Sequence, residues 1–542
     1  MTVWIRQVTP ATIDKNEPQT GIRKMDMQGP MKLLAFTAVT MFATNLAAQS
    51  VTLNSLDGTL SITGELVEYT GETYLISSNV GRLTVAADAV VCVGAACPDL
   101  FPTYSEFTIS GSRELALNLM PTLLDGFAAS LGFDMIEQID AGGNPQVLYV
   151  NEAGEDVVKI SFEMLGSSSG VQSLLTGGAS LALTTRQARE AESAAFIRAG
   201  FDDIQTPELE TILALDGLVV VTSNSNTVRT ISNENIARVF AGTITDWSAL
   251  GGPSGPINIY GRPEDSSTGA QFTQAFMRPA RLDISDAGNM LDSDKSVADA
   301  VAADPNGIGF TNFANIGNAR PVSLLGSCGI QSPANIFSIQ AEEYPYTTRM
   351  YAYKSSGNAQ PMVDLLVDYL STAEAQQLIG FSGYVDQLMT EVPLNNLGVR
   401  FLSAALPTNT EITLVQLQSM MVELSAAHRM TITLRFEPGT TQLDGRGEAD
   451  VARMAKMMAD GMLAGKQIML LGFTDSVGDG EVNQSLSEAQ AEQVRQQVLT
   501  TGNGQLDPAR IETRGYGELS PLGCNEDIEG RRINRRVEVW MR

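Results

Sequence analysis

The sequence predicts an α/β and α+β protein of several domains, and three changes of pattern along the chain indicate it. The chain has 542 residues, more than one hydrophobic core normally organises, so about two to four domains are expected. Short alternating strands fill residues 49–103, strands that alternate with helices begin near Phe107, and a third pattern begins near Met430. We therefore expect a small β module, a larger α/β domain and a C-terminal domain.

The first 48 residues are interpreted as a leader rather than as a folded domain. Residues 1–30 are polar and without pattern, which indicates an over-extended start. Residues 31–48 begin with Met31 and Lys32, continue through an apolar run and end in small residues, as is typical of a secretory signal peptide. No later apolar run is long enough to span a membrane, so we expect a soluble mature protein. No cysteine follows the cleavage region, so no lipoprotein anchor is expected there.

Residues 49–103 alternate in short strand-like pieces separated by glycine-containing turns, which predicts a small β module. Cys92 and Cys97 lie close together and are predicted to form a disulfide in an oxidising compartment; the alternative is two buried thiols. The sequence leaves the pairing of Cys328 and Cys524 open. A scaffold or docking role is the default interpretation of this module.

The most informative stretch is residues 261–272, where a turn with three hydroxyl groups joins a strand to a helix. Ser266, Ser267 and Thr268 stand where the first backbone N–H groups of the helix lack intrahelical partners and the helix dipole favours an anion. Arg262 precedes them and could fix the loop or contact the anion. An ordinary helix cap explains the same residues, because Ser and Thr are preferred there for capping alone.

Residues 104–395 resemble the phosphate-binding periplasmic proteins of the PstS type. The resemblance depends on the Arg-x-x-x-Ser-x-Thr pattern at 262–268, and on residues 231–247, which are similar to the family's helix followed by Phe-x-Gly-x-Ile-x-x-Trp. It implies a two-lobed periplasmic-binding-protein (type II) fold with the ligand in the cleft between lobes. The partners that it implies are phosphate or a related oxyanion and an ABC transporter permease. The predicted ligand-binding residues are Ser112, Ser168, Ser169, Arg262, Ser266, Ser267 and Thr268.

Three residues of this domain depart from the family pattern. Arg113 and Glu114 replace the Gly-Thr that usually follows the first anion loop, at residues 108–112. Ser180 replaces an Asp that, in the family, accepts a proton from the ligand. A buried carboxylate acceptor would select a protonated oxyanion over a fully ionised one, so these departures bear on which anion is bound.

After a connector at residues 396–427, residues 428–542 resemble the OmpA-like peptidoglycan-binding domain, a βαβ fold. Four ordered motifs carry this resemblance, at residues 472–478, 483–487, 514–518 and 534–538. The resemblance implies capture of the diaminopimelate side chain of peptidoglycan, for which the predicted residues are Asp475, Asn483, Gln490 and Arg536. The family's arginine for the ligand carboxylate falls on Gln490, and an amide cannot form the bidentate pair of a guanidinium.

Composition excludes several other classes of protein. The formal net charge of -27 argues against nucleic acid as a partner. His428 is the single histidine, which removes most zinc, haem and Ser-His schemes, so no metal and no cofactor are expected. Residues 166–170 satisfy Gly-x-Ser-x-Gly, but a serine hydrolase would lack its base.

These observations together predict a binding protein and not an enzyme. It would bind an oxyanion, phosphate first, in the periplasm, and its C-terminal domain would tether it to peptidoglycan at the cell wall or outer membrane. Two alternatives stay open. One is a structural or sensory cell-envelope protein whose binding lobe has lost phosphate or binds another ligand. The other is an enzyme that acts on the wall, for which no acid–base pair stands out.

Overall fold

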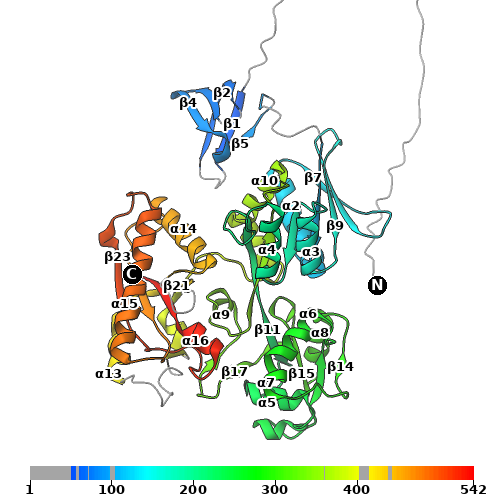
Figure 1. Cartoon of the computed structure of the whole chain (residues 1–542), viewed down its shortest axis with the longest axis vertical. Coiled ribbons are helices and arrows are strands. Elements are labelled where there is room, and N and C mark those ends of the chain that lie inside the picture. The colour runs from blue at the N-terminus through cyan, green and yellow to red at the C-terminus, as the bar shows by residue number, and fades with distance from the viewer. Residues whose placement is uncertain are drawn as a thin grey trace, which may run out of the picture.

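The structure is a computed structural model, and it describes residues 50–55, 60–70, 73–94, 96–97, 104–358, 360–398, 400–401, 414–436 and 442–542. The predicted start and signal peptide, residues 1–48, lie outside the described residues. Figure 1 shows a small β module (blue), two lobes of a larger α/β domain (cyan to green) and a C-terminal domain (orange to red). Among the described residues, no helix combines the length and the apolar character needed to cross a membrane.

The β module is one antiparallel sheet with strand order β4-β3-β2-β1-β5. Its strands are β1 (Ser50–Ser55), β2 (Ser61–Tyr69), β3 (Thr73–Ser78), β4 (Gly81–Ala86) and β5 (Val90–Val93). Alternate side chains of these strands form its core, with Leu53, Tyr74 and Ile76 fully buried. A disulfide joins Cys92 to Cys97, as the sequence predicts.

The first lobe packs helices on a sheet whose central strands are parallel, so that the ends of those strands and the following helix starts lie together. Its strands are β6 (Ser105–Gly111), β7 (Asp134–Ile139), β8 (Pro145–Val150), β9 (Asp156–Glu163) and β10 (Leu181–Thr184). Its helices are α1 (Arg113–Asn118), α2 (Met120–Ser130), α3 (Ser167–Leu175), α4 (Glu190–Ala199), α10 (Pro361–Leu370) and α11 (Ala373–Phe381).

The second lobe has its own hydrophobic core, in which Phe240, Phe272 and Phe310 pack together. Its strands are β12 (Thr230–Ser232), β13 (Asn258–Gly261), β14 (Asn289–Met290), β15 (Gly307–Asn312), β16 (Arg320–Pro321), β17 (Ser323–Leu325) and β18 (Gln331–Ser332). Its helices are α5 (Asn233–Phe240), α6 (Ser267–Phe272), α7 (Arg278–Ala280), α8 (Asp294–Ala303) and α9 (Ile336–Gln340).

Two long strands cross between the lobes: β11 (Glu210–Thr222) and β19 (Thr347–Tyr353). The first half of β11 pairs with β19, and its second half, from Leu218, pairs with β15 of the second lobe. The crossing therefore falls near Asp216, and loops from both lobes meet there (Figure 1). This is the two-lobed arrangement that the sequence predicts.

The C-terminal domain packs helices on a sheet with strand order β20-β21-β24-β22-β23. Its strands are β20 (Glu391–Pro393), β21 (His428–Leu434), β22 (Ile468–Phe473), β23 (Ile511–Gly515) and β24 (Arg536–Met541). Its helices are α13 (Leu414–Leu424), α14 (Gly445–Ala459), α15 (Gly480–Thr501) and α16 (Ile528–Asn534).

Two segments outside the predicted range 428–542 belong to this C-terminal body. Strand β20, assigned from sequence to the binding domain, is an edge strand of the C-terminal sheet. Helix α13 lies in the predicted connector, and it buries Leu417 and Met420 against Trp540. The cause is the apolar stripe of α13, which needs a partner surface.

Candidate functional site

The first predicted anion loop ends β6 on the first lobe. Gly111 has a φ of 129°, and a Cβ there would lie 2.1 Å from the carbonyl oxygen of Leu183, so the backbone requires glycine. The Ser112 N–H donates to the same carbonyl at 2.8 Å. The Ser112 hydroxyl accepts a hydrogen bond from the Leu115 N–H at 3.4 Å and caps α1. Ser112 is thus buried at the start of a helix, where it acts as the cap.

The second predicted loop begins α3 and touches the first. A Cβ on Gly170 would lie 2.6 Å from the Cα of Gly111, so the two loops are in direct contact. Ser168 and Ser169 are exposed on the first turn of α3. The Ser168 hydroxyl accepts a hydrogen bond from Nη2 of Arg186 at 2.8 Å. These contacts join two helix starts of the first lobe at one place.

The third predicted loop joins β13 to α6 on the second lobe. It is tight, because a Cβ on Gly269 would lie 1.9 Å from the carbonyl oxygen of Pro263. The Ser266 hydroxyl accepts from the Gly269 N–H at 3.0 Å and donates to the Pro263 carbonyl at 2.6 Å. Ser267 is exposed and Thr268 is buried. The contacts of Ser266 are therefore those of an ordinary helix cap, whereas the hydroxyl of Thr268 contacts other side chains.

Thr268 and Arg262 both contact the carboxylate of Asp294. Thr268 Oγ1 donates to Asp294 Oδ2 at 3.1 Å, and Arg262 Nε lies 3.7 Å from the same oxygen. Arg262 Nη1 also donates to the carbonyl of Leu291. Burial raises the pKa of Asp294, against the smaller opposing effects of Thr268 and Arg262. Donors that would face an anion are thus directed at protein acceptors in this structure.

Glu114, which the sequence marks as a departure from the family pattern but not as a ligand-binding residue, bridges the two lobes. Glu114 lies on the first turn of α1, and its Oε1 accepts from Nδ2 of Asn312, at the end of β15, at 2.9 Å. The Tyr384 hydroxyl donates to the same oxygen at 3.4 Å. Burial, followed by the charge of Asp294, raises the pKa of Glu114. Sequence position gave no signal for this contact, because 198 residues separate Glu114 from Asn312.

A third carboxyl group, Asp216, is buried where β11 crosses between the lobes. Its Oδ1 accepts from the backbone N–H groups of Gly217 at 2.7 Å and Ala314 at 3.0 Å. Its Oδ2 has no hydrogen-bond partner among the residues that the structure describes. Burial, followed by the charge of Glu114, raises the pKa of Asp216 well above its usual value. The site therefore offers carboxyl acceptors as well as hydroxyl and backbone donors.

Ser180 does not lie among these loops, which corrects its placement from sequence. The register of β10 with the parallel β6 puts Ser180 at the amino-terminal end of the strand, whereas Ser112 follows the carboxyl end. The Ser180 hydroxyl accepts from Nδ2 of Asn358 at 3.3 Å. The residue that follows β10 at the loop end is Thr185, whose N–H donates to Ser167 Oγ at 3.2 Å. Strand register, rather than a motif, identifies Thr185 as the position beside the site.

In the C-terminal domain, Asp475 lies just after β22. Its Oδ2 pairs with Nη1 of Arg535 at 2.5 Å, and its Oδ1 accepts from the Val477 N–H at 3.0 Å. Asn483, in the first turns of α15, is buried, and its Nδ2 donates to Glu518 at 2.8 Å. A carboxylate and an arginine thus lie side by side at the position predicted for wall contact.

The other two predicted wall-binding residues are inside the domain. Gln490 is 2% exposed, and its Oε1 has no hydrogen-bond partner among the described residues. Arg536 is fully buried and donates to Glu538 at 2.6 Å and to two backbone carbonyls. Because these contacts use its donors, Arg536 stabilises the fold and is not placed to contact the wall. Arg535 is the arginine beside Asp475.

Buried ion pairs join the C-terminal domain to the binding domain. Glu342, in the turn after α9, accepts from Nε and Nη2 of Arg349 at 2.6 and 2.9 Å and pairs with Arg446 at 2.8 Å. Arg349 also donates to Asp444 at 2.8 Å. Burial by itself would raise the pKa of Glu342, but Arg349 and Arg446 hold it well below its usual value. Through Arg349, strand β19, which crosses between the lobes, is thereby connected to the C-terminal domain.

A second buried cluster of ion pairs extends this contact surface between the binding domain and the C-terminal domain, which we call the seam. Arg429 is fully buried, lies 3.2 Å from Glu538 and lies 3.6 Å from Glu343 of the binding domain. Arg400 pairs with both of these carboxylates. Each buried guanidinium thus has a carboxylate partner, as a low-dielectric site requires.

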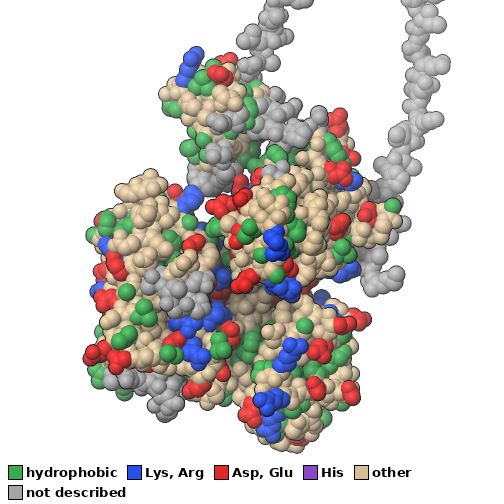
Figure 2. Space-filling view, viewed as in Figure 1, with side chains coloured by type: hydrophobic (Ala, Val, Ile, Leu, Met, Phe, Trp, Pro, Cys, Tyr) green, Lys and Arg blue, Asp and Glu red, His purple; other side chains and the backbone are tan. Residues whose placement is uncertain are grey.

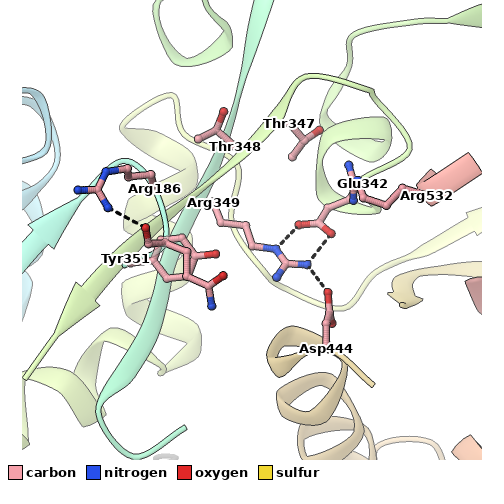
Figure 3. Close-up of a pocket in the computed structure, with 9 residues that line it drawn as sticks. Arg186, Glu342, Thr347, Thr348, Arg349, Tyr351, Asp444 and Arg532 are labelled. Carbon is pink, nitrogen blue, oxygen red and sulfur yellow. Dashed lines mark hydrogen bonds and ion pairs between the residues drawn. The ribbon is translucent and has the colours of Figure 1, made fainter. Parts of the chain in front are cut away.

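A cavity of about 310 Å³ lies at this seam, and Figure 3 shows Arg349 reaching Glu342 and Asp444 beside it. Its lining residues come from both lobes, β19 and the C-terminal domain: Arg186, Gln187, Glu342, Thr347, Thr348, Arg349, Tyr351, Asp444 and Arg532. Lys and Arg side chains gather beside the seam on the face drawn in Figure 2. Arg186 also donates to Ser168, so one side chain connects this cavity to the second anion loop.

A disulfide between Cys328 and Cys524 links the two domains covalently across the seam. It joins the turn between β17 and β18 on the second lobe to the loop before α16. A Cβ on Gly326 would lie 2.4 Å from the Cys524 sulfur, so the two segments are closely packed. Potential ligand atoms of Cys328, Cys524 and Glu526 lie within 4.8 Å of one another, but the disulfide uses both sulfurs.

Comparison with known proteins assigns the two larger parts of the chain. Residues 147–381 match the model of the PBP superfamily domain, and residues 435–535 match the model of the OmpA family. The phosphate-binding protein PstS of Borreliella burgdorferi is 21% identical over 235 residues, which cover 42% of this chain and 79% of that protein. Outer membrane protein A of Bordetella avium is 37% identical over 105 residues, which cover 19% of this chain and half of that protein.

Among solved structures, an ABC-type phosphate transport receptor from Vibrio cholerae matches 52% of this chain and 99% of its own, with 20% sequence identity and a TM-score of 0.38. The chain therefore combines a PBP-like domain, similar to phosphate-binding proteins, with a C-terminal OmpA-like domain. These relatives are binding and outer-membrane proteins by name.

Proposed function

We propose that this protein binds a small oxyanion, phosphate first, in the cleft between its lobes, and that its OmpA-like domain holds it to peptidoglycan in the periplasm. The observation that carries the first half is a hydrogen bond between the two lobes. It brings the predicted loops of the two lobes together: Asn312, whose side chain lies 3.5 Å from the Thr268 hydroxyl on the second lobe, donates to Glu114 on the first lobe, two residues after Ser112. An ABC transporter permease would receive the anion, as the resemblance to transport proteins implies.

The chemistry of the cleft supports an anion of this size. The starts of α1, α3 and α6 supply backbone N–H groups, and Arg262 supplies a cation near Thr268 and Asp294. The two disulfides favour an oxidising compartment such as the periplasm. Because the net charge of -27 repels an anion at long range, the anion would be held by these local groups and not by the electrostatic field of the whole protein.

Thr268→Val tests the anion site, because it removes a hydroxyl and keeps the buried shape. Titration calorimetry of the mature chain with phosphate should show affinity weakened about tenfold to a hundredfold, as loss of one hydrogen bond to a charged group implies. Thr176→Val, an exposed threonine beyond the loops, is the matched control. Equal affinities of wild type and Thr268→Val would place the anion elsewhere.

The second candidate function, a structural or sensory role with no phosphate, is favoured by one specific observation. The Arg262 and Asn312 donors already have internal acceptors at Leu291, Asp294 and Glu114. The same titration separates the two functions. If the protein shows no heat of binding with phosphate, sulfate or phosphate esters, the result would support the structural or sensory function.

Asp475→Asn tests the attachment to the wall. The proposed contact is between the Asp475 carboxylate and an ammonium group of the peptidoglycan stem, with Arg535 beside it for a carboxylate. Removing the charge should reduce retention on purified peptidoglycan about tenfold, since a charge-assisted hydrogen bond contributes about 1.5–3 kcal/mol. Asp460→Asn, an exposed carboxylate on the same domain, is the control. If both variants are retained like wild type, Asp475 is not a wall contact.

A further inference from the structure

The cavity at the seam is large enough for a small ligand, and arginines from three separate parts of the chain line it. Its volume of about 310 Å³ lies at the lower end of the range for ligand pockets, which is about 300–1,000 Å³. Arg186 comes from the first lobe, Arg349 from β19 and Arg532 from α16 of the C-terminal domain (Figure 3). The cavity is separate from the cleft, because no predicted anion-loop residue is among the described residues that line it.

The two carboxylates that line the cavity already have a partner on each oxygen. Oδ1 of Asp444 accepts from the Gly447 N–H at 2.7 Å, and Oδ2 accepts from Nη2 of Arg349 at 2.8 Å. In Glu342, Oε1 accepts from Nε of Arg349 at 2.6 Å, and Oε2 accepts from Nη2 of the same arginine at 2.9 Å. Among the described residues, the cavity therefore has no unpaired carboxylate with which to bind a cation.

Arg532, by contrast, has hydrogen-bond donors that the protein does not use. Its Nε donates to Glu529 at 2.8 Å, and within the part of the chain that the structure describes neither of its Nη atoms donates a hydrogen bond. Its side chain is 38% exposed and lines the cavity. The N–H groups of a planar guanidinium match the paired oxygens of a carboxylate or a phosphate. The unused donors of Arg532 therefore favour an anionic ligand.

The positive charges on this side of the cavity repel one another. Arg435 lies directly behind Arg532, because its Nη1 donates to the backbone carbonyls of Arg532 at 3.4 Å and Ile533 at 3.0 Å. Burial, followed by the charge of Arg532, lowers the pKa of Arg435 to about 9. An anion bound to Arg532 would offset this repulsion. The arrangement is local, since the chain as a whole carries a net charge of -27.

We propose that the seam cavity is a second binding site, which takes a small anion with two or more acidic groups, carboxylate or phosphate. One acidic group accepts from the Nη atoms of Arg532. Another lies near the positive charges of Arg186 and Arg349, whose hydrogen bonds to protein acceptors hold them in place. This site goes beyond the proposed function, because it needs neither an anion in the cleft nor contact with the wall.

Arg532→Gln is the informative variant, because it removes the charge from an exposed side chain and leaves the buried ion pairs intact. Titration calorimetry of the mature chain, with citrate and separately with pyrophosphate, should show binding by wild type. In the variant the affinity should fall about tenfold to a hundredfold, as loss of a charge-assisted hydrogen bond implies. Arg542→Gln, whose side chain is 42% exposed on the same domain, should leave the affinity unchanged. Binding of citrate alone identifies a carboxylate site, and binding of pyrophosphate alone identifies a phosphate site.

The remaining outcomes overturn the inference without touching the proposed function. Wild type that binds neither probe has no such site. Equal affinities of Arg532→Gln and Arg542→Gln place the ligand away from the seam. A loss in Thr268→Val as large as that in Arg532→Gln places it in the cleft. Should Arg532→Gln unfold, Arg532→Lys, which keeps the charge but loses the planar guanidinium, must still weaken binding.

Discussion

Replacing Glu342 with glutamine is expected to lower the free energy of unfolding by about 3–5 kcal/mol, the usual cost of removing one partner from a buried ion pair. Glu342 is 5% exposed, and its carboxylate is shared by Arg349, Arg435 and Arg446. Glutamine fills the same space but leaves these guanidinium groups without that charge. Urea unfolding followed by tryptophan fluorescence reports both sides of the seam, because Trp247 is buried in the second lobe and Trp540 in the C-terminal domain.

The pH dependence of this loss has a definite sign. The arginines hold the pKa of Glu342 well below its usual value, so its contribution to stability is fully present above the pKa of the unfolded chain, about 4.3. It is lost as the pH falls through the lower, folded value. The difference between wild type and Glu342→Gln should therefore shrink in acid.

Asp299→Asn is the matched control for this experiment. Asp299 pairs with Lys295 on an exposed helix face, where a salt bridge contributes only about 0–1 kcal/mol. A Glu342→Gln variant that unfolds like Asp299→Asn would show that the seam does not depend on this carboxylate. If the transitions reported by Trp247 and Trp540 occur at different urea concentrations, the two domains unfold separately rather than together.

Local patterns in the sequence predicted the elements and the loops well, because they depend on neighbours along the chain. The short strands predicted within residues 49–103 are β1 to β5, and the alternation of strands and helices predicted from near Phe107 begins with β6 at Ser105. Ser112 and Ser266 do begin helices, since strand-to-helix junctions with a hydroxyl are readable from sequence.

The contacts that distinguish this protein depend on residues far apart in the chain. Arg429, Arg435 and Glu538 lie in or beside strands, where charged residues usually face solvent, yet all three are buried in the seam. Arg429 and Arg435 pair with Glu343 and Glu342 of the binding domain, and Glu538 pairs with Arg400 of the predicted connector, so no periodicity within the C-terminal sequence reveals their burial. Ser180 was misplaced for a related reason: its distance from the loops depends on the register of two parallel strands.

Replacing both Cys328 and Cys524 with serine is expected to cost about 5 kcal/mol, because the lost bond closes a loop with a sequence separation of 196. In the chain-entropy account, a long loop gains many conformations in the unfolded state when its cross-link is removed. Thermal unfolding with and without a reducing agent measures the effect. Double replacement of Cys92 and Cys97, whose separation is 5, is the control and should cost about 2 kcal/mol.

Comparing the two double cysteine replacements also tests how the binding domain and the C-terminal domain are held together. The disulfide and the ion pairs of Glu342 and Glu343 cross the same seam, so they restrain the same motion. If the long-range disulfide costs no more than the short one, the ion pairs by themselves already keep the domains together in the partly unfolded chain. If its loss is larger, as expected, the covalent link keeps the cleft at a fixed position relative to the domain that we propose binds the wall.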